Sequence, residues 1–175
     1  MKLLNYLAAA ALAAACGHAA AEDLTKLVTL TGAPPLQTAG YSMTHLLSGD
    51  FTDTITFTPT VGSSFVDASL ITIGLDATNI DFHSIMLGST PMTITTDGGG
   101  LVEAAATYHS SMAGLLEITV WGTAGGGGPA GTPINAVYSG TLNVLAVPEP
   151  ATYGMLLGGL GVLGWLARRR SAQAG

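Results

Sequence analysis

One acidic residue breaks an otherwise regular pattern and is the first candidate for chemistry in this sequence. In residues 51–58 (FTDTITFT) every even position is threonine, and the apolar odd positions are Phe51, Ile55 and Phe57. Such alternation predicts a strand with one apolar face and one hydroxyl face. Asp53 falls on the apolar face, where a carboxylate must be paired, hydrogen-bonded or bound to a metal.

Two interpretations of Asp53 stay open from the sequence. In the first, the carboxylate lies at the solvent end of its strand or accepts backbone N–H bonds, as most buried polar groups are satisfied locally. In the second it helps to bind Ca²⁺, which takes hard oxygen ligands. The further candidate ligands are Asp67, Asp76 and Asp81.

The other titratable residues show no spacing that predicts a catalytic or metal centre. The sequence has no Gly-x-Ser-x-Gly and no His-Glu-x-x-His motif, and no metal-ligand spacing joins His45, His83 and His109. Glu103 and Glu117 are candidate paired carboxylates for glycoside hydrolysis, but that chemistry needs a cleft lined with aromatic residues, and these make up 6% of the chain. We therefore expect no enzymatic activity and no cofactor, with a small secreted hydrolase as one alternative.

Charge is distributed unevenly along the chain. Between residues 22 and 147 the sequence has ten acidic residues and a single basic one, Lys26. So few cations cannot neutralise a row of phosphates, which excludes nucleic-acid binding. The acidic surplus keeps a second alternative open, a Ca²⁺-dependent carbohydrate-binding module.

The elements that must position these residues are strands. Apolar and polar residues alternate in four further segments, namely 70–75, 80–87, 115–121 and 136–147, and Gly-rich turn signals lie at 48–50, 62–64, 88–89, 97–100 and 125–129. We expect His83 at the surface and Trp121 in the core. The pattern predicts an all-β domain over residues 22–146, a single antiparallel β-sandwich with a jelly-roll arrangement as one option.

The first 21 residues have the pattern of a secretory signal peptide. Lys2 provides the positive charge, residues 3–15 are apolar, and Ala19 to Ala21 supply small residues before the predicted cleavage site at Glu22. We therefore expect export and removal of residues 1–21 by signal peptidase.

A second signal follows the predicted β domain. Residues 151–167 are 17 residues without a charge, near the lower limit for a membrane-spanning helix. The basic cluster Arg168, Arg169 and Arg170 comes next, and the positive-inside rule places it and the tail 171–175 in the cytoplasm. Pro148, Glu149 and Pro150 precede the apolar run, and the two prolines favour an extended segment that a processing enzyme can bind.

This order of proline motif, short apolar helix and arginine cluster, residues 147–170, resembles the PEP-CTERM sorting signal of Gram-negative bacteria. The segment with Phe51, Asp53, Ile55 and Phe57 is similar to the FxDxF-type subgroup of PEP-CTERM proteins, with Ile55 where the name motif has Phe. The resemblance implies processing by an exosortase, with inner-membrane anchoring through 151–167 before processing and the cell surface or extracellular matrix as the destination. We therefore expect a structural or adhesive, non-enzymatic protein linked to extracellular polysaccharide or biofilm.

Overall fold

The structure is a computed structural model that describes residues 21–97, 99–147 and 150–173. The predicted signal peptide, apart from Ala21, and the motif residues Pro148 and Glu149 lie outside these ranges.

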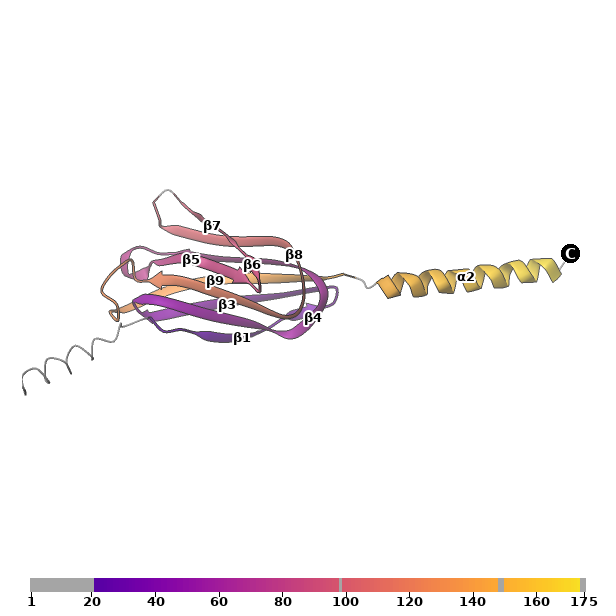
Figure 1. Ribbon diagram of the computed structural model, residues 1–175, viewed down its shortest axis with the longest axis horizontal. Coiled ribbons are helices and arrows are strands. Elements are labelled where there is room, and N and C mark those ends of the chain that lie inside the picture. Colours follow the sequence, from indigo (N-terminus) through magenta and orange to yellow (C-terminus); the bar gives the residue numbers. More distant parts are fainter. Residues whose placement is uncertain (1–20, 98, 148–149, 174–175) are drawn as a thin grey trace, which may run out of the picture.

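The described residues form nine strands, one short 3-10 turn and one α-helix (Figure 1). The strands are β1 (Thr25–Thr29), β2 (Thr31–Ala33), β3 (Leu36–Leu47), β4 (Gly49–Ile73), β5 (Ile80–Leu87), β6 (Thr90–Pro91), β7 (Thr93–Thr96), β8 (Val102–Ala124) and β9 (Pro133–Ala146). The turn η1 spans Asp76–Thr78, and the helix α2 spans Pro150–Gln173. The predicted all-β class is confirmed.

A long antiparallel pair of strands, β4 and β8, runs through the whole domain. The first half of β4 pairs with the second half of β8, and after register shifts between Phe57 and Ser64 the second half of β4 pairs with the first half of β8. β1 and β5 flank this strand pair in its first half, whereas β9, β3 and β7 extend it in the second. Bulges of this kind let a strand bend from one sheet layer into another.

Aromatic side chains from the two halves meet in the core. The Phe57 ring on β4 lies edge-on to the Tyr41 ring on β3, with centroids 5.6 Å apart. The Phe82 ring on β5 lies edge-on to the Tyr138 ring on β9 at the same centroid distance. The inward faces of the two halves therefore pack against each other, while Figure 1 shows β1 and β7 on opposite sides of the domain.

Three details correct the predictions. β1 pairs with β4 in parallel, so the sheet is only mostly antiparallel. The expected turn at 62–64 lies inside β4, where glycine and serine occupy the bulge. Trp121 is 51% exposed, because the alternation that buries Ile118 and Val120 points residue 121 outward.

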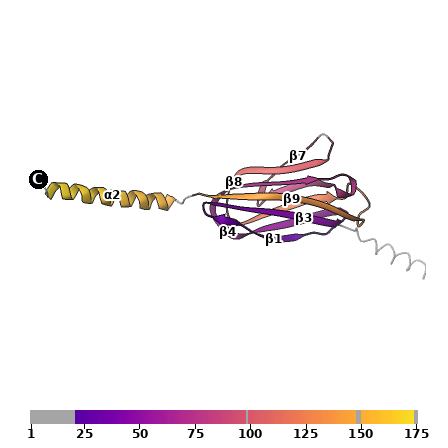
Figure 2. The ribbon, with the colours of Figure 1, turned by 180° about the vertical axis from the view of Figure 1, so that it is seen from behind.

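The helix predicted over 151–167 is present as the longer α2, and Figure 2 shows it extending away from the strands beyond the end of β9. Its described side chains are exposed. Among the described residues, no helix combines the length and the apolar character that crossing a membrane requires. The membrane span over 151–167 is therefore not confirmed; five glycines dilute the apolar run and arginines follow it.

Candidate functional site

Asp53 is fully buried at the centre of a polar cluster. It occupies an inward position of β4, between Phe51 and Ile55. Its Oδ1 accepts a hydrogen bond from the backbone N–H of Leu24 at 2.9 Å. Its Oδ2 lies 3.0 Å from Nε2 of His45 and accepts a 2.8 Å hydrogen bond from the hydroxyl of Tyr138. The carboxylate is thus satisfied by one backbone group and two side chains, and it does not lie at the solvent end of the strand.

β3 places His45 against Asp53. Alternate residues of this strand point into the core, and His45 follows Tyr41 and Met43 in that series. Its ring lies 4.0 Å from that of Phe51, centroid to centroid, in a tilted arrangement. Because the carboxylate can only accept, Nε2 must carry the proton in this contact. Nδ1 is buried and has no hydrogen-bond partner among the described residues.

Tyr138 comes from β9 and completes the cluster. Burial raises the pKa of its hydroxyl, and the negative charge and hydrogen bond of Asp53 raise that pKa further. The phenol therefore stays protonated and donates to Asp53 throughout the physiological pH range.

The cluster is sealed from solvent. His45 and Asp53 are 0% exposed and Tyr138 is 1% exposed. A His–Asp pair at hydrogen-bond distance is part of many nucleophilic sites, but these side chains cannot contact a substrate without local opening. Their evident effect is to join β3 and β9 of one half of the domain to β4 of the other.

The four aspartates proposed as Ca²⁺ ligands do not come together. Asp76 and Asp81 line one shallow hollow of about 270 Å³ at an end of the domain, whereas Asp53 lies in the core. Asp67 accepts a hydrogen bond from the backbone N–H of His109 at 2.6 Å. In the parts of the chain that the structure describes, no three His, Cys, Asp or Glu residues are close enough to hold a metal ion.

Glu103 and Glu117 do not form a catalytic pair. The carboxylate of Glu103 contacts Phe82, whose partner on β8 is Gly122. Gly122 lies five residues, or about 17 Å, from Glu117 along the strand, which exceeds the roughly 5–9.5 Å between the carboxyl groups of a glycosidase. Glu103 is buried and accepts the backbone N–H of Phe82 at 2.6 Å, which gives it a structural role. His83 is exposed as predicted, and its Nε2 lies 2.8 Å from Oγ1 of Thr123.

The residues of the proposed FxDxF motif share one environment. All four point inward from β4 and are at most 2% exposed; they are Phe51, Asp53, Ile55 and Phe57. The strand and its inward face are as predicted, while the assignment to that subgroup stays a prediction.

The segment with the predicted sorting signal starts where the β domain ends. Residue 146 is the last of β9, and the backbone N–H of Val147 donates to the carbonyl of Ser63 at 2.9 Å. Helix α2 begins at Pro150, and the guanidinium of Arg169 lies 5.6 Å from the ring centroid of Trp165. Ion-to-ring contacts of this kind are favourable and hold the arginine along the helix.

Comparison with solved structures finds only distant similarity. A mutant of PliG, a periplasmic lysozyme inhibitor of g-type lysozyme from Escherichia coli, is 11% identical with a TM-score of 0.32; the alignment covers 70% of this chain and 99% of that one. PliG of Salmonella Typhimurium is 16% identical with a TM-score of 0.34, over 68% and 97% of the two chains. CsCBM6-3 from Clostridium stercorarium, solved with cellobiose, is 17% identical with a TM-score of 0.24, over 69% and 82%. No curated protein matches the chain.

Comparison with protein families gives a direct match. Residues 146–170 match the family described as the PEP-CTERM protein-sorting motif. The matched segment begins at the last residue of β9 and contains the proline motif, most of α2 and the three arginines. The predicted resemblance is thus confirmed: the chain carries a PEP-CTERM protein-sorting motif over residues 146–170.

Proposed function

We propose that this chain is an exported protein with a non-enzymatic structural or adhesive role at the cell surface or in the extracellular polysaccharide matrix of a Gram-negative bacterium. The observation that carries the proposal is the sorting motif at residues 146–170, which implies export, anchoring at the membrane and processing by an exosortase. The motif begins at the end of β9, so the whole β domain lies on one side of it as a unit for delivery.

The arginine cluster supports one orientation at the membrane. Lys and Arg next to an anchoring segment stay on the cytoplasmic side. In this arrangement α2 holds the chain at the inner membrane, residues 168–175 face the cytoplasm, and the β domain lies outside until the exosortase processes the chain. The predicted signal peptide 1–21 would start this export.

The β domain itself supports a binding or structural role. The His45–Asp53 contact is sealed in the core, and the outward strand positions are rich in hydroxyl groups, as in the threonines of β4. Packing between the two halves supports the β-sandwich predicted from the sequence. Such a rigid body presents fixed surfaces, which lowers the entropy lost when a partner binds.

Substitution of the two prolines of the motif tests the sorting step. Pro148→Ala with Pro150→Ala should leave the β domain folded but retain the protein unprocessed at the inner membrane. Membrane fractionation and intact mass in the native host measure both effects. The matched control is Pro129→Ala, in the loop between β8 and β9, which should be processed normally. Normal processing of the double variant would contradict the proposal.

The destination is tested separately. The processed protein should be found in the extracellular polymer fraction or on the surface of intact cells, accessible to added protease. Recovery of all processed protein in the periplasm would contradict a surface or matrix role.

A further inference from the structure

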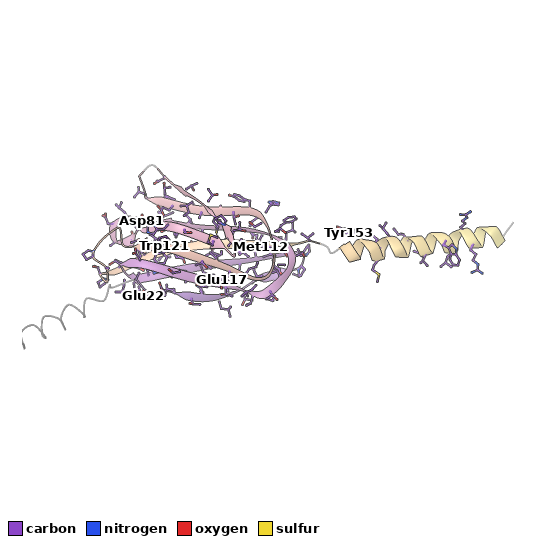
Figure 3. All side chains as sticks on the ribbon, in the orientation of Figure 1. Glu22, Asp81, Met112, Glu117, Trp121 and Tyr153 are labelled. Atoms are coloured by element: carbon purple, nitrogen blue, oxygen red, sulfur yellow. The ribbon has the colours of Figure 1, made fainter. Side chains whose placement is uncertain are left out.

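The outward face of β4, β8 and β5 carries a large aromatic side chain in the middle of a sheet. Trp121 on β8 pairs with Thr52 on β4 and with Ser84 on β5, so threonine and serine lie on either side of it. Two residues along β8 in either direction, Thr119 and Thr123 point outward as well. We call the outward residues of these three strands around Trp121 the Trp121 face; Figure 3 shows Asp81, Trp121 and Glu117 on the domain.

The indole of Trp121 is only half covered. Its exposed fraction is 51%, and the part that is covered includes the imidazole of His83, whose centroid lies 5.0 Å from that of the indole at an interplanar angle of 55°. Burial of an aromatic ring is strongly favourable. An indole that folding leaves exposed on a sheet therefore offers a flat apolar surface that a ligand can cover. The neighbouring imidazole limits the movement of that surface.

Ordered polar groups border the indole. The hydroxyl of Thr123 donates a 2.7 Å hydrogen bond to Oδ1 of Asp50, so its oxygen must accept at 2.8 Å from Nε2 of His83. Nearby, the side-chain amide of Asn79 donates to Oδ1 of Asp81 at 2.7 Å. These groups are fixed by one another, and each carboxylate keeps lone pairs for further donors. The face therefore combines a flat apolar surface with preorganised acceptors.

The charge of the face limits what it can bind. Asp50, Asp81 and Glu117 lie on its three strands, and none of these strands contains lysine or arginine. The single basic residue of the domain, Lys26, is occupied elsewhere, because its Nζ donates to the carbonyl of Ser42 at 2.7 Å. An anionic polymer would meet like charges here, whereas a ligand rich in hydroxyl groups meets acceptors.

We infer that the Trp121 face is a binding site for an uncharged polysaccharide chain, which stacks one sugar ring on the indole and donates hydroxyl hydrogens to the carboxylates. The outward row from Thr123 to Glu117 extends about 20 Å along β8, at about 3.4 Å per residue, which is long enough for several sugar units. This inference rests on the proposed matrix role and names the surface and ligand class behind it.

Native affinity electrophoresis of the exported protein, purified from its host, tests the site. The gels contain hydroxyethylcellulose, dextran or galactomannan as uncharged polymers, or alginate as the anionic one. At least one uncharged polymer should retard the wild-type protein, and alginate should not. Trp121→Ala should weaken the apparent affinity by about tenfold or more, as truncation of a central tryptophan does at other interfaces. Trp121→Phe should retain most of the affinity.

Two further variants make the result specific. His83→Ala removes the imidazole beside the indole and should weaken retardation. Because His83 is exposed, the domain should stay folded in this variant. The matched control is Tyr108→Ala, which removes the other large exposed ring of β8. The side chain of Tyr108 is 77% exposed and lies in the opposite half of the β4–β8 pair, so this variant should be retarded like the wild type. Circular dichroism and thermal melts confirm that each variant is folded.

Several outcomes would overturn the assignment. They are retardation by none of the uncharged polymers, retardation by alginate alone, wild-type retardation of Trp121→Ala, or loss of retardation in Tyr108→Ala but not in Trp121→Ala. The last would place the ligand in the hollow of about 410 Å³ that Tyr108 lines with Ser69 and Thr141. None of these results alters the processing and location of the protein, which the proline variants measure independently.

Discussion

The hydroxyl of Tyr138 donates a 2.8 Å hydrogen bond to Oδ2 of Asp53, 85 residues earlier in the chain. The same oxygen lies 3.0 Å from Nε2 of His45. One buried carboxylate therefore connects three strands, and its hydrogen bonds are made inside a core where an unpaired polar group is costly.

Tyr138→Phe should destabilise the domain by about 1.5–3 kcal/mol, because it removes a hydrogen bond to a charged acceptor and leaves Asp53 short of a donor. Urea unfolding at neutral pH measures the change. Tyr41→Phe removes only a 3.3 Å bond to the carbonyl of Ser69 and should cost less, while the exposed Tyr108→Phe should cost nothing measurable. Equal losses in the three variants would contradict the special role of the Asp53 contact.

Stability should fall steeply above about pH 10. Burial raises the pKa of Tyr41 and of Tyr138 above the ordinary value of 10.0, and Asp53 raises that of Tyr138 further. Between the unfolded and folded pKa values the unfolded chain loses these protons first, so stability decreases as pH rises, by up to about 1.4 kcal/mol per pH unit for each tyrosine. Below pH 10 the two tyrosines should cause no pH dependence.

Urea unfolding at a series of pH values from 8 to 12 measures this slope. Tyr138→Phe and Tyr41→Phe should each flatten it, whereas Tyr108→Phe should leave it unchanged. An alkaline slope that survives in the double Tyr41/Tyr138 variant would assign it to other groups.

Gly140→Ala should destabilise the domain by about 1–3 kcal/mol. A Cβ atom at this position of β9 would overlap the carbonyl oxygen of Ser69 and the phenol of Tyr41, which lies over the glycine. Gly62→Ala is the matched control, since a Cβ there has no neighbour within 4 Å and the residue also lies in a strand. Thermal melts of both variants test the expected difference, and a Gly140→Ala domain as stable as wild type would show that the overlap relaxes freely.

Phe57→Ala should lower the free energy of unfolding by about 3–5 kcal/mol, because the ring is 0% exposed and its removal leaves a cavity in the core. Phe65, on the same strand but 39% exposed, gives the control, and Phe65→Ala should cost clearly less. Denaturant unfolding measures both. If Phe57→Ala lowered the free energy of unfolding by less than about 1 kcal/mol, the neighbouring side chains would have relaxed into the cavity.

The local pattern predicted some elements closely. β5 has the predicted bounds of residues 80–87, and the alternation from Phe51 to Phe57 correctly identified the inward face of β4. β3 was missed, although Tyr41, Met43 and His45 alternate on its inward face, because small and polar residues separate them and weaken the apolar signal. The outward position of Trp121 was predictable from the same alternation of side chains along a strand, since Ile118 and Val120 point inward.

The partners of Asp53 could not be predicted in this way. The sequence identifies Asp53 as an exception on an apolar face, but His45 lies on a neighbouring element and Tyr138 comes from a strand near the other end of the domain. Their meeting depends on strand order and on the bend of the β4–β8 strand pair, which are long-range properties that residue alternation does not encode.

The place of β9 in the sheet has a mechanical consequence. This strand lies between β3 and β4, and the chain is hydrogen-bonded on both sides where the strand ends. The backbone N–H of Ala146 donates to the carbonyl of Pro35, and that of the next residue, Val147, donates to the carbonyl of Ser63. Tension applied along the polypeptide that follows is therefore transmitted in shear to two ladders at once and does not peel a single edge strand. While the protein is attached through its sorting segment, a force on that segment therefore acts on a strand that is hydrogen-bonded on both sides.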